Sequence, residues 1–210
     1  MTKIRICGLT TLQAVELVNR LKPDAAGFVF IRGNARYIDQ KKAAELKSQL
    51  DPSIKVVGIF ENERPIIVTT LLRMGIIDAV QFGGSETEDD IMNLRRQFEC
   101  PIYQVYQVES PKDALQAEWS IADLVMLRIQ KGSEDARPWN LTRFSRRPFI
   151  LAGDLSPETI GEAMALCHPY AVDLGTGIRT ESGIDPDLTE KTVLQIRKLD
   201  EEAALAAAAE

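Results

Sequence analysis

The chain has 210 residues, of which 45% are hydrophobic, and this length suits a single domain with a sizeable core. Its formal net charge is −6, so the surface as a whole repels polyanions. We therefore do not expect nucleic acid or an acidic membrane to be the main partner, and any anion site must be local.

Short apolar runs rich in β-branched residues recur along the whole chain and predict strands. In chain order they are residues 4–7, 25–30, 56–60, 79–82, 102–107, 124–127, 149–152 and 171–174. Stretches with apolar residues at three-and-four spacing predict helices at 12–21, 40–50, 66–74, 91–98 and 158–166. Weaker helical signals lie at 111–117 and 139–144. Strand and helix therefore alternate throughout.

Nearly continuous apolar strands are typical of a parallel sheet that is covered by helices. Eight repeats of about 25 residues favour closure of that sheet, so we expect an α/β fold, a single (β/α)8 TIM barrel with eight parallel strands. We assign residues 1–200 to this barrel domain. Residues 201–210 form an Ala/Glu-rich tail that we expect to extend the last helix.

The cysteines, Cys7, Cys100 and Cys167, lie far apart, and His168 is the only histidine. This spacing provides no metal-ligand set, so we expect no metal site, and an odd number of cysteines favours a reducing compartment. The start lacks a basic-then-apolar signal segment, and no apolar run approaches the roughly 18 residues that span a bilayer. The expected location is the cytoplasm.

In a barrel of this type the reactive groups lie at the carboxyl ends of the strands and in the loops that follow. Here the first strand ends at Cys7, although a free cysteine by itself is more often a small core residue. The loops after the last two strands are rich in glycine, and their candidate residues are Gly153, Asp154, Gly175, Thr176 and Gly177. Such turns can bring backbone N–H groups against a phosphate, but a single glycine loop is equally well explained by turn geometry. A phosphorylated sugar is the leading ligand.

Seven segments follow one another in a distinctive order: KIRICGLT (3–10), GFVF (27–30), ARYI (35–38), VVGIFEN (56–62), DAVQF (78–82), LAGDLSPE (151–158) and VDLGTGI (172–178). In sequence and spacing they resemble the phosphoribosylanthranilate isomerase family of tryptophan biosynthesis. The resemblance runs from Lys3 to about Leu199.

The resemblance implies an enzyme of the aldose-ketose isomerase type. Its reaction is the Amadori rearrangement of N-(5-phosphoribosyl)anthranilate to a 1-deoxyribulose 5-phosphate product, without metal or cofactor. The resemblance also implies that Cys7 is the base that removes the C2 proton, and that Arg36 holds the anthranilate carboxylate. The backbone around Gly153 and 175–177 then matches the phosphate site. We expect a monomer or a homodimer.

These implied roles make chemical demands. A cysteine acts as a base only as its thiolate, so Cys7 needs a neighbouring positive charge or a helix N-terminus. Arginine suits a carboxylate because one guanidinium can bind both oxygens.

The sequence departs from the family where strand six ends. The family's general acid there is an aspartate, and the matching residue here is Arg128, which cannot donate its proton. The family's second glycine in loop seven is Asp154. Asp154 is either a replacement acid or an ion-pair partner of Arg128; we favour the ion pair, because a buried unpaired arginine is costly. Glu134 and Asp135 are further candidate acids.

Three functions remain open. The first is the family's isomerase, with Cys7 as base, Arg36 as carboxylate clamp, Asp154 as acid and backbone amides of the last two loops on the phosphate. Its activity is expected to be weak or altered, because losing a general acid costs roughly a hundred- to ten-thousand-fold in rate. The second is a diverged paralogue acting on another phosphosugar, for which Arg128 supplies a new contact. The third is a catalytically dead barrel that binds a phosphorylated metabolite or a protein partner.

Overall fold

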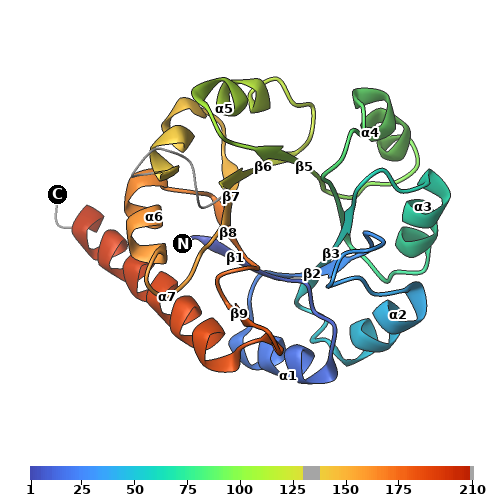
Figure 1. Cartoon of the computed structure of the whole chain (residues 1–210), viewed down its shortest axis with the longest axis horizontal. Coiled ribbons are helices and arrows are strands. Elements are labelled where there is room, and N and C mark those ends of the chain that lie inside the picture. The colour runs from blue at the N-terminus through green and yellow to red at the C-terminus, as the bar shows by residue number, and fades with distance from the viewer. Residues whose placement is uncertain (130–137, 209–210) are drawn as a thin grey trace.

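Eight parallel strands close into a barrel, in which each strand pairs with the next and the last pairs with the first. The structure is a computed structural model and describes residues 1–129 and 138–208. The strands are β1 (Lys3–Cys7), β2 (Ala25–Val29), β3 (Lys55–Phe60), β4 (Ala79–Phe82), β5 (Ile102–Gln107), β6 (Leu124–Ile129), β7 (Phe149–Gly153) and β8 (Ala171–Leu174). Figure 1 shows them end-on as a ring. The predicted TIM barrel is confirmed.

Helices alternate with the strands and surround the ring (Figure 1). They are α1 (Leu12–Leu21), α2 (Gln40–Gln49), α3 (Pro65–Arg73), α4 (Glu88–Arg95), α5 (Pro111–Ala117), the 3-10 helix η1 (Pro138–Phe144), α6 (Ile160–Cys167) and α7 (Pro186–Ala208). A hairpin of β9 (Arg179–Thr180) and β10 (Gly183–Ile184) precedes α7. The apolar pattern predicted every strand of the barrel but not this hairpin.

Helix α4 begins three residues before the predicted range of 91–98. Thr87 accepts from the backbone N–H of Asp90, whose carboxylate accepts in return from the N–H of Thr87 at 2.8 Å. This capping box satisfies helix N–H groups that would otherwise lack partners. Polar caps, rather than apolar spacing, therefore set where the helix starts.

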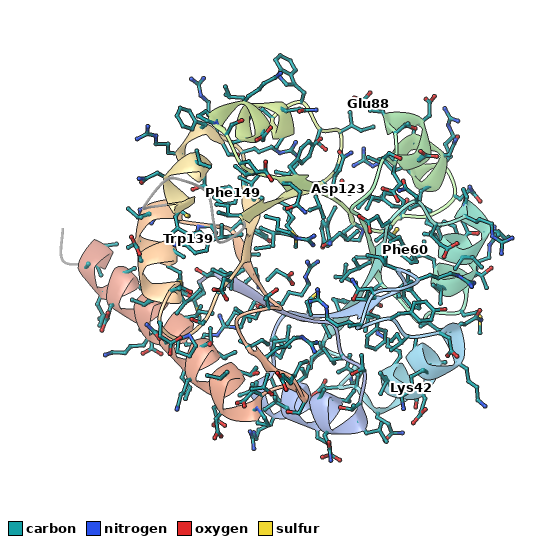
Figure 2. All side chains as sticks on the ribbon, viewed as in Figure 1. Lys42, Phe60, Glu88, Asp123, Trp139 and Phe149 are labelled. Atoms are coloured by element: carbon teal, nitrogen blue, oxygen red, sulfur yellow. The ribbon has the colours of Figure 1, made fainter. Side chains whose placement is uncertain are left out.

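Side chains alternate between the two faces of each strand, and this alternation separates the core from the barrel interior. On β1, Ile4 and Ile6 pack into the main hydrophobic core between sheet and helices. Phe60 and Phe149, labelled in Figure 2, belong to the same core, which lies outside the ring. Arg5 and Cys7 alternate with these isoleucines along β1, so they face the interior of the barrel. The interior therefore holds buried polar groups such as Arg5 beside smaller apolar clusters.

The last helix joins the two ends of the chain. The N–H and hydroxyl of Thr2 both donate to Asp200 of α7 at 2.7 Å, and Arg197 donates to the carbonyl of Thr2 at 2.9 Å. Beyond Asp200 the described side chains are exposed, although α7 continues to Ala208. Within the described parts of the chain, no helix combines the length and apolarity needed to cross a membrane.

Candidate active site

A cavity of about 440 Å³ opens at the carboxyl ends of the strands. The residues that line it come from the loop after β2 and from the ends of β6, β7 and β8. They are Arg36, Arg128, Ile129, Ala152, Gly153, Asp154, Asp173, Gly175 and Thr176. Six of the residues that the sequence singled out therefore meet at one mouth, where barrel enzymes carry their chemistry.

Cys7 is the last residue of β1 and lies directly beneath this mouth. A Cβ added to Gly175 would lie 3.8 Å from the Cβ of Cys7 and 3.4 Å from Nη1 of Arg36, so the three residues are neighbours. The thiol itself is buried and packs with Val29. A side chain on Gly27 of the adjacent strand would overlap Sγ, so glycine is required there to leave room for the sulfur.

The surroundings of Cys7 favour the protonated thiol. Burial raises its pKa to about 12, and the neighbouring carboxylate of Asp173 acts in the same direction. The positive charges of Arg5 and Arg36 oppose this but do not outweigh it. Cationic neighbours of the predicted kind are therefore present, yet without a ligand Cys7 is a thiol at neutral pH.

Arg5 and Asp173 form a buried ion pair inside the barrel. They are register partners on β1 and β8, and Nε of Arg5 donates to Oδ1 of Asp173 at 2.6 Å. Arg5 was not expected at the site from its sequence position. A signal was present, because Arg5 lies two residues before Cys7 and therefore shares its face of β1.

Arg179 of β9 is a second site residue that was not predicted from the sequence. Its Nη2 donates to the backbone carbonyls of Cys7, at 3.1 Å, and of Gly8. A Cβ on Gly8 would lie 2.7 Å from Cδ of Arg36 and 2.8 Å from Nη2 of Arg179, so both arginines cover this glycine. Burial and the charge of Arg36 lower the pKa of Arg179. Its hairpin carries too few residues to show a strand pattern.

Arg128 lies at the end of β6 with its side chain half-buried at the cavity. Among residues 1–129 and 138–208, nothing forms an ion pair or hydrogen bond with its guanidinium, so the favoured ion pair with Asp154 is not formed in this structure. Asp154 has an interaction of its own. The candidate acids Glu134 and Asp135 lie outside the described residues.

The two glycine-bearing loops meet at their bases. A Cβ on Gly177 would overlap the carbonyl of Leu155, and a Cβ on Gly153, whose φ is +149°, would overlap the carbonyl of Ile129. Gly153, Gly175 and Thr176 line the cavity, whereas Gly177 serves this close packing. Of the residues expected at a phosphate, Gly177 is therefore the one not found in the cavity lining.

The sequence pattern of the family described as N-(5'phosphoribosyl)anthranilate (PRA) isomerase matches residues 4–195. A curated relative from Endomicrobium trichonymphae, named N-(5'-phosphoribosyl)anthranilate isomerase, is 36% identical over 95% of this chain and all of its own. The phosphoribosyl anthranilate isomerase structure from Thermus thermophilus superposes with a TM-score of 0.82 at 26% identity, covering 94% of this chain and 100% of that one.

Another solved isomerase of that name, in complex with reduced 1-(o-carboxyphenylamino)-1-deoxyribulose 5-phosphate, has a TM-score of 0.79 at 25% identity. The match covers 92% of this chain and 97% of that one.

Proposed function

The chain belongs to the N-(5'-phosphoribosyl)anthranilate isomerase family and is an isomerase, and on that premise we propose that it rearranges a phosphoribosyl arylamine with its own set of acid–base residues. One observation carries the proposal: Cys7, Arg36 and the two late glycine loops meet at one mouth of the barrel. The mouth therefore combines a cavity large enough for the substrate, a cation that can bind a carboxylate, and loop backbone that can approach a phosphate.

The substrate's two anionic ends are bound by different means. Backbone around Gly175 and Thr176 receives the phosphate, because the absence of a side chain at Gly175 lets the anion approach the main chain. Arg36 holds the aryl carboxylate through its planar guanidinium. Arg36 and Gly175 both adjoin Cys7, so this orientation keeps the sugar C1 and C2 close to the thiol.

Cys7 is the proposed base. Opening of the furanose ring protonates the ring oxygen and leaves a positively charged C1=N bond, and loss of the C2 proton then gives the enol form of the ketose. A cation formed above Cys7 favours its thiolate and offsets the burial that raises its pKa. Asp173 is the nearest carboxylate that can take the thiol proton, and Arg5 holds that carboxylate in place.

Asp154 is the proposed acid for the ring oxygen. It lies one strand from Arg128, in the lining of the same cavity, and a carboxyl group can donate a proton whereas a guanidinium cannot. Arg128 serves as a substrate contact.

Turnover of N-(5'-phosphoribosyl)anthranilate by the purified protein, followed by fluorescence of the aryl group, tests the proposal. We expect turnover, with a loss of roughly a hundred- to ten-thousand-fold in kcat for Cys7→Ala and for Asp154→Asn. Cys167→Ala is the matched control for removing a buried thiol, since Cys167 lies on α6 outside the cavity.

Activity that ignores both Cys7→Ala and Asp154→Asn would defeat the assigned roles. Thermal stabilisation by the substrate without any turnover would instead favour the catalytically dead binding barrel. Turnover of a different phosphosugar alone would favour the diverged paralogue.

A further inference from the structure

Three arginines gather at the mouth of the barrel. Arg36 and Arg128 line the cavity, and Arg179 packs beside Arg36 over Gly8. This concentration is unusual for a chain whose formal net charge is −6. Such a local positive field attracts anionic ligands.

Among residues 1–129 and 138–208, hydrogen bonds at the mouth engage the guanidinium of one of these three arginines, Arg179. The buried carboxylate of Asp173 is taken by Arg5 at 2.6 Å. Nη2 of Arg179 donates to two backbone carbonyls. In the part of the chain that the structure describes, the guanidiniums of Arg36 and Arg128 have no hydrogen-bond or ion-pair partner. Two donor-rich cations therefore face one cavity.

A phosphoribosyl arylamine with a single carboxylate does not match this arrangement. Its phosphate is bound by loop backbone and its carboxylate by Arg36, which leaves Arg128 facing the ligand without an anion. Binding such a ligand would remove solvent from a half-buried cation and give nothing in return, which is a cost. A further anionic group on the ligand would turn that cost into a charge-assisted contact.

Resting on the proposed function, we propose that the preferred substrate carries a second anionic group on its aryl part, and that Arg128 binds this group while Arg36 binds the first carboxylate. The group is a carboxylate or a phosphate, because both have the planar or branched oxygen geometry that a guanidinium engages through two N–H bonds.

The positions of the arginines set the shape of this ligand. Nη1 of Arg36 reaches the loop after β8, at Gly175, whereas Arg128 ends β6. Strands β6 and β8 lie two strand spacings apart, roughly 10 Å between their backbones. Anionic groups on opposite positions of one aromatic ring can span this distance with a hydrogen bond at each end.

Stable linear analogues test the proposal. Reductive coupling of ribose 5-phosphate to aniline, anthranilate or 2-aminoterephthalate gives arylamino-deoxyribitol 5-phosphates with zero, one or two carboxylates, and a fourth analogue carries a phosphonate as the second anion. Calorimetry with the whole chain should show that the second anion strengthens binding at least tenfold over the anthranilate analogue. The advantage should shrink at high salt, because screening weakens charge pairs.

Arg128→Met should abolish the advantage, and Arg128→Lys should retain part of it. Arg146→Met removes an exposed arginine in the loop between η1 and β7 and should keep the full advantage. Comparing the two-carboxylate analogue with the phosphonate analogue identifies the second anionic group, which is the one that gives the tighter binding.

Equal binding of the one- and two-carboxylate analogues to the unaltered protein would overturn the inference and leave the proposed function standing. An advantage that survives Arg128→Met would overturn it as well, because the second anion would then bind elsewhere. Failure of every analogue to bind would count against the proposed function itself.

Discussion

Nε of Arg5 donates to Oδ1 of Asp173 across 2.6 Å, and the two side chains are only 5% and 9% exposed. The pair joins β1, which ends in Cys7, to β8, which leads into the Gly175 loop. The two buried charges therefore balance each other inside the barrel, and the carboxylate of Asp173 beside the Cys7 thiol is held in one position.

Breaking this pair should be costly. In Arg5→Met the buried carboxylate of Asp173 loses its partner, and we expect the free energy of unfolding to fall by roughly 3–5 kcal/mol in urea denaturation. The double replacement Arg5→Met with Asp173→Leu should recover most of the loss, because no charge then remains buried.

An exposed pair with the same separation is the control. Arg95 and Asp123 also lie 2.6 Å apart, but their side chains are 32% and 46% exposed. Arg95→Met should therefore cost about 1 kcal/mol at most. An equal loss for Arg5→Met and Arg95→Met would contradict the assigned burial of the Arg5 pair.

The raised pKa of Cys7 predicts a loss of stability at alkaline pH. The unfolded thiol ionises near its ordinary pKa of 9.0, whereas the folded thiol stays protonated until about 12. Stability from this group is therefore complete below pH 9 and is lost as pH rises towards 12. Between pH 8 and 10 the expected loss is about 1.4 kcal/mol relative to Cys7→Ser, which has no ionisable group there.

Unfolding of the two proteins at matched pH values measures this difference, since other titrating groups cancel between them. A difference that stays constant from pH 8 to 10 would show that Cys7 ionises normally in the fold.

Gly27 is predicted to be essential for the position of the thiol. A Cβ there would overlap Sγ of Cys7, so Gly27→Ala should displace the sulfur, destabilise the fold by roughly 1–3 kcal/mol and lower kcat at least tenfold. Gly83→Ala is the control, because its Cβ would meet nothing closer than 3.6 Å. Comparable kinetics for both variants would argue against the crowded geometry around Cys7.

The barrel was predictable because each strand must bury both of its faces. A parallel strand enclosed by helices reads as a short continuous apolar run, and the run at 79–82 predicted β4 with its correct bounds. The ends of the strands were harder to predict, because polar residues can still belong to a strand. β6 extends two residues past its apolar run, so Arg128 lies in the strand rather than after it.

The site was only partly predictable. Cys7, Arg36 and the late glycines stood out because they end strands or follow them. Asp173 and Arg5 are charged residues within apolar runs, and only register across β1 and β8 shows that they pair. Arg179 reaches Cys7 from a hairpin of two-residue strands, which no periodic pattern can reveal.

Arg128 offers the sharpest test of how this chain departs from its family. The resemblance assigns the general acid to the residue at this position, and a carboxyl group placed there would lie in the same cavity as Arg36 and Asp154. Arg128→Asp should therefore raise kcat for N-(5'-phosphoribosyl)anthranilate, by roughly ten- to a hundredfold, because a second proton donor becomes available. In that background Asp154→Asn should lower kcat less than it does alone, since the two acids substitute for each other.

Arg128→Asp should also weaken binding of the two-carboxylate analogue, so activity on one ligand and affinity for the other move in opposite directions. Steady-state kinetics and calorimetry on the four proteins of this cycle measure both quantities, and a kcat that falls in Arg128→Asp would show that arginine takes part in the chemistry at this position.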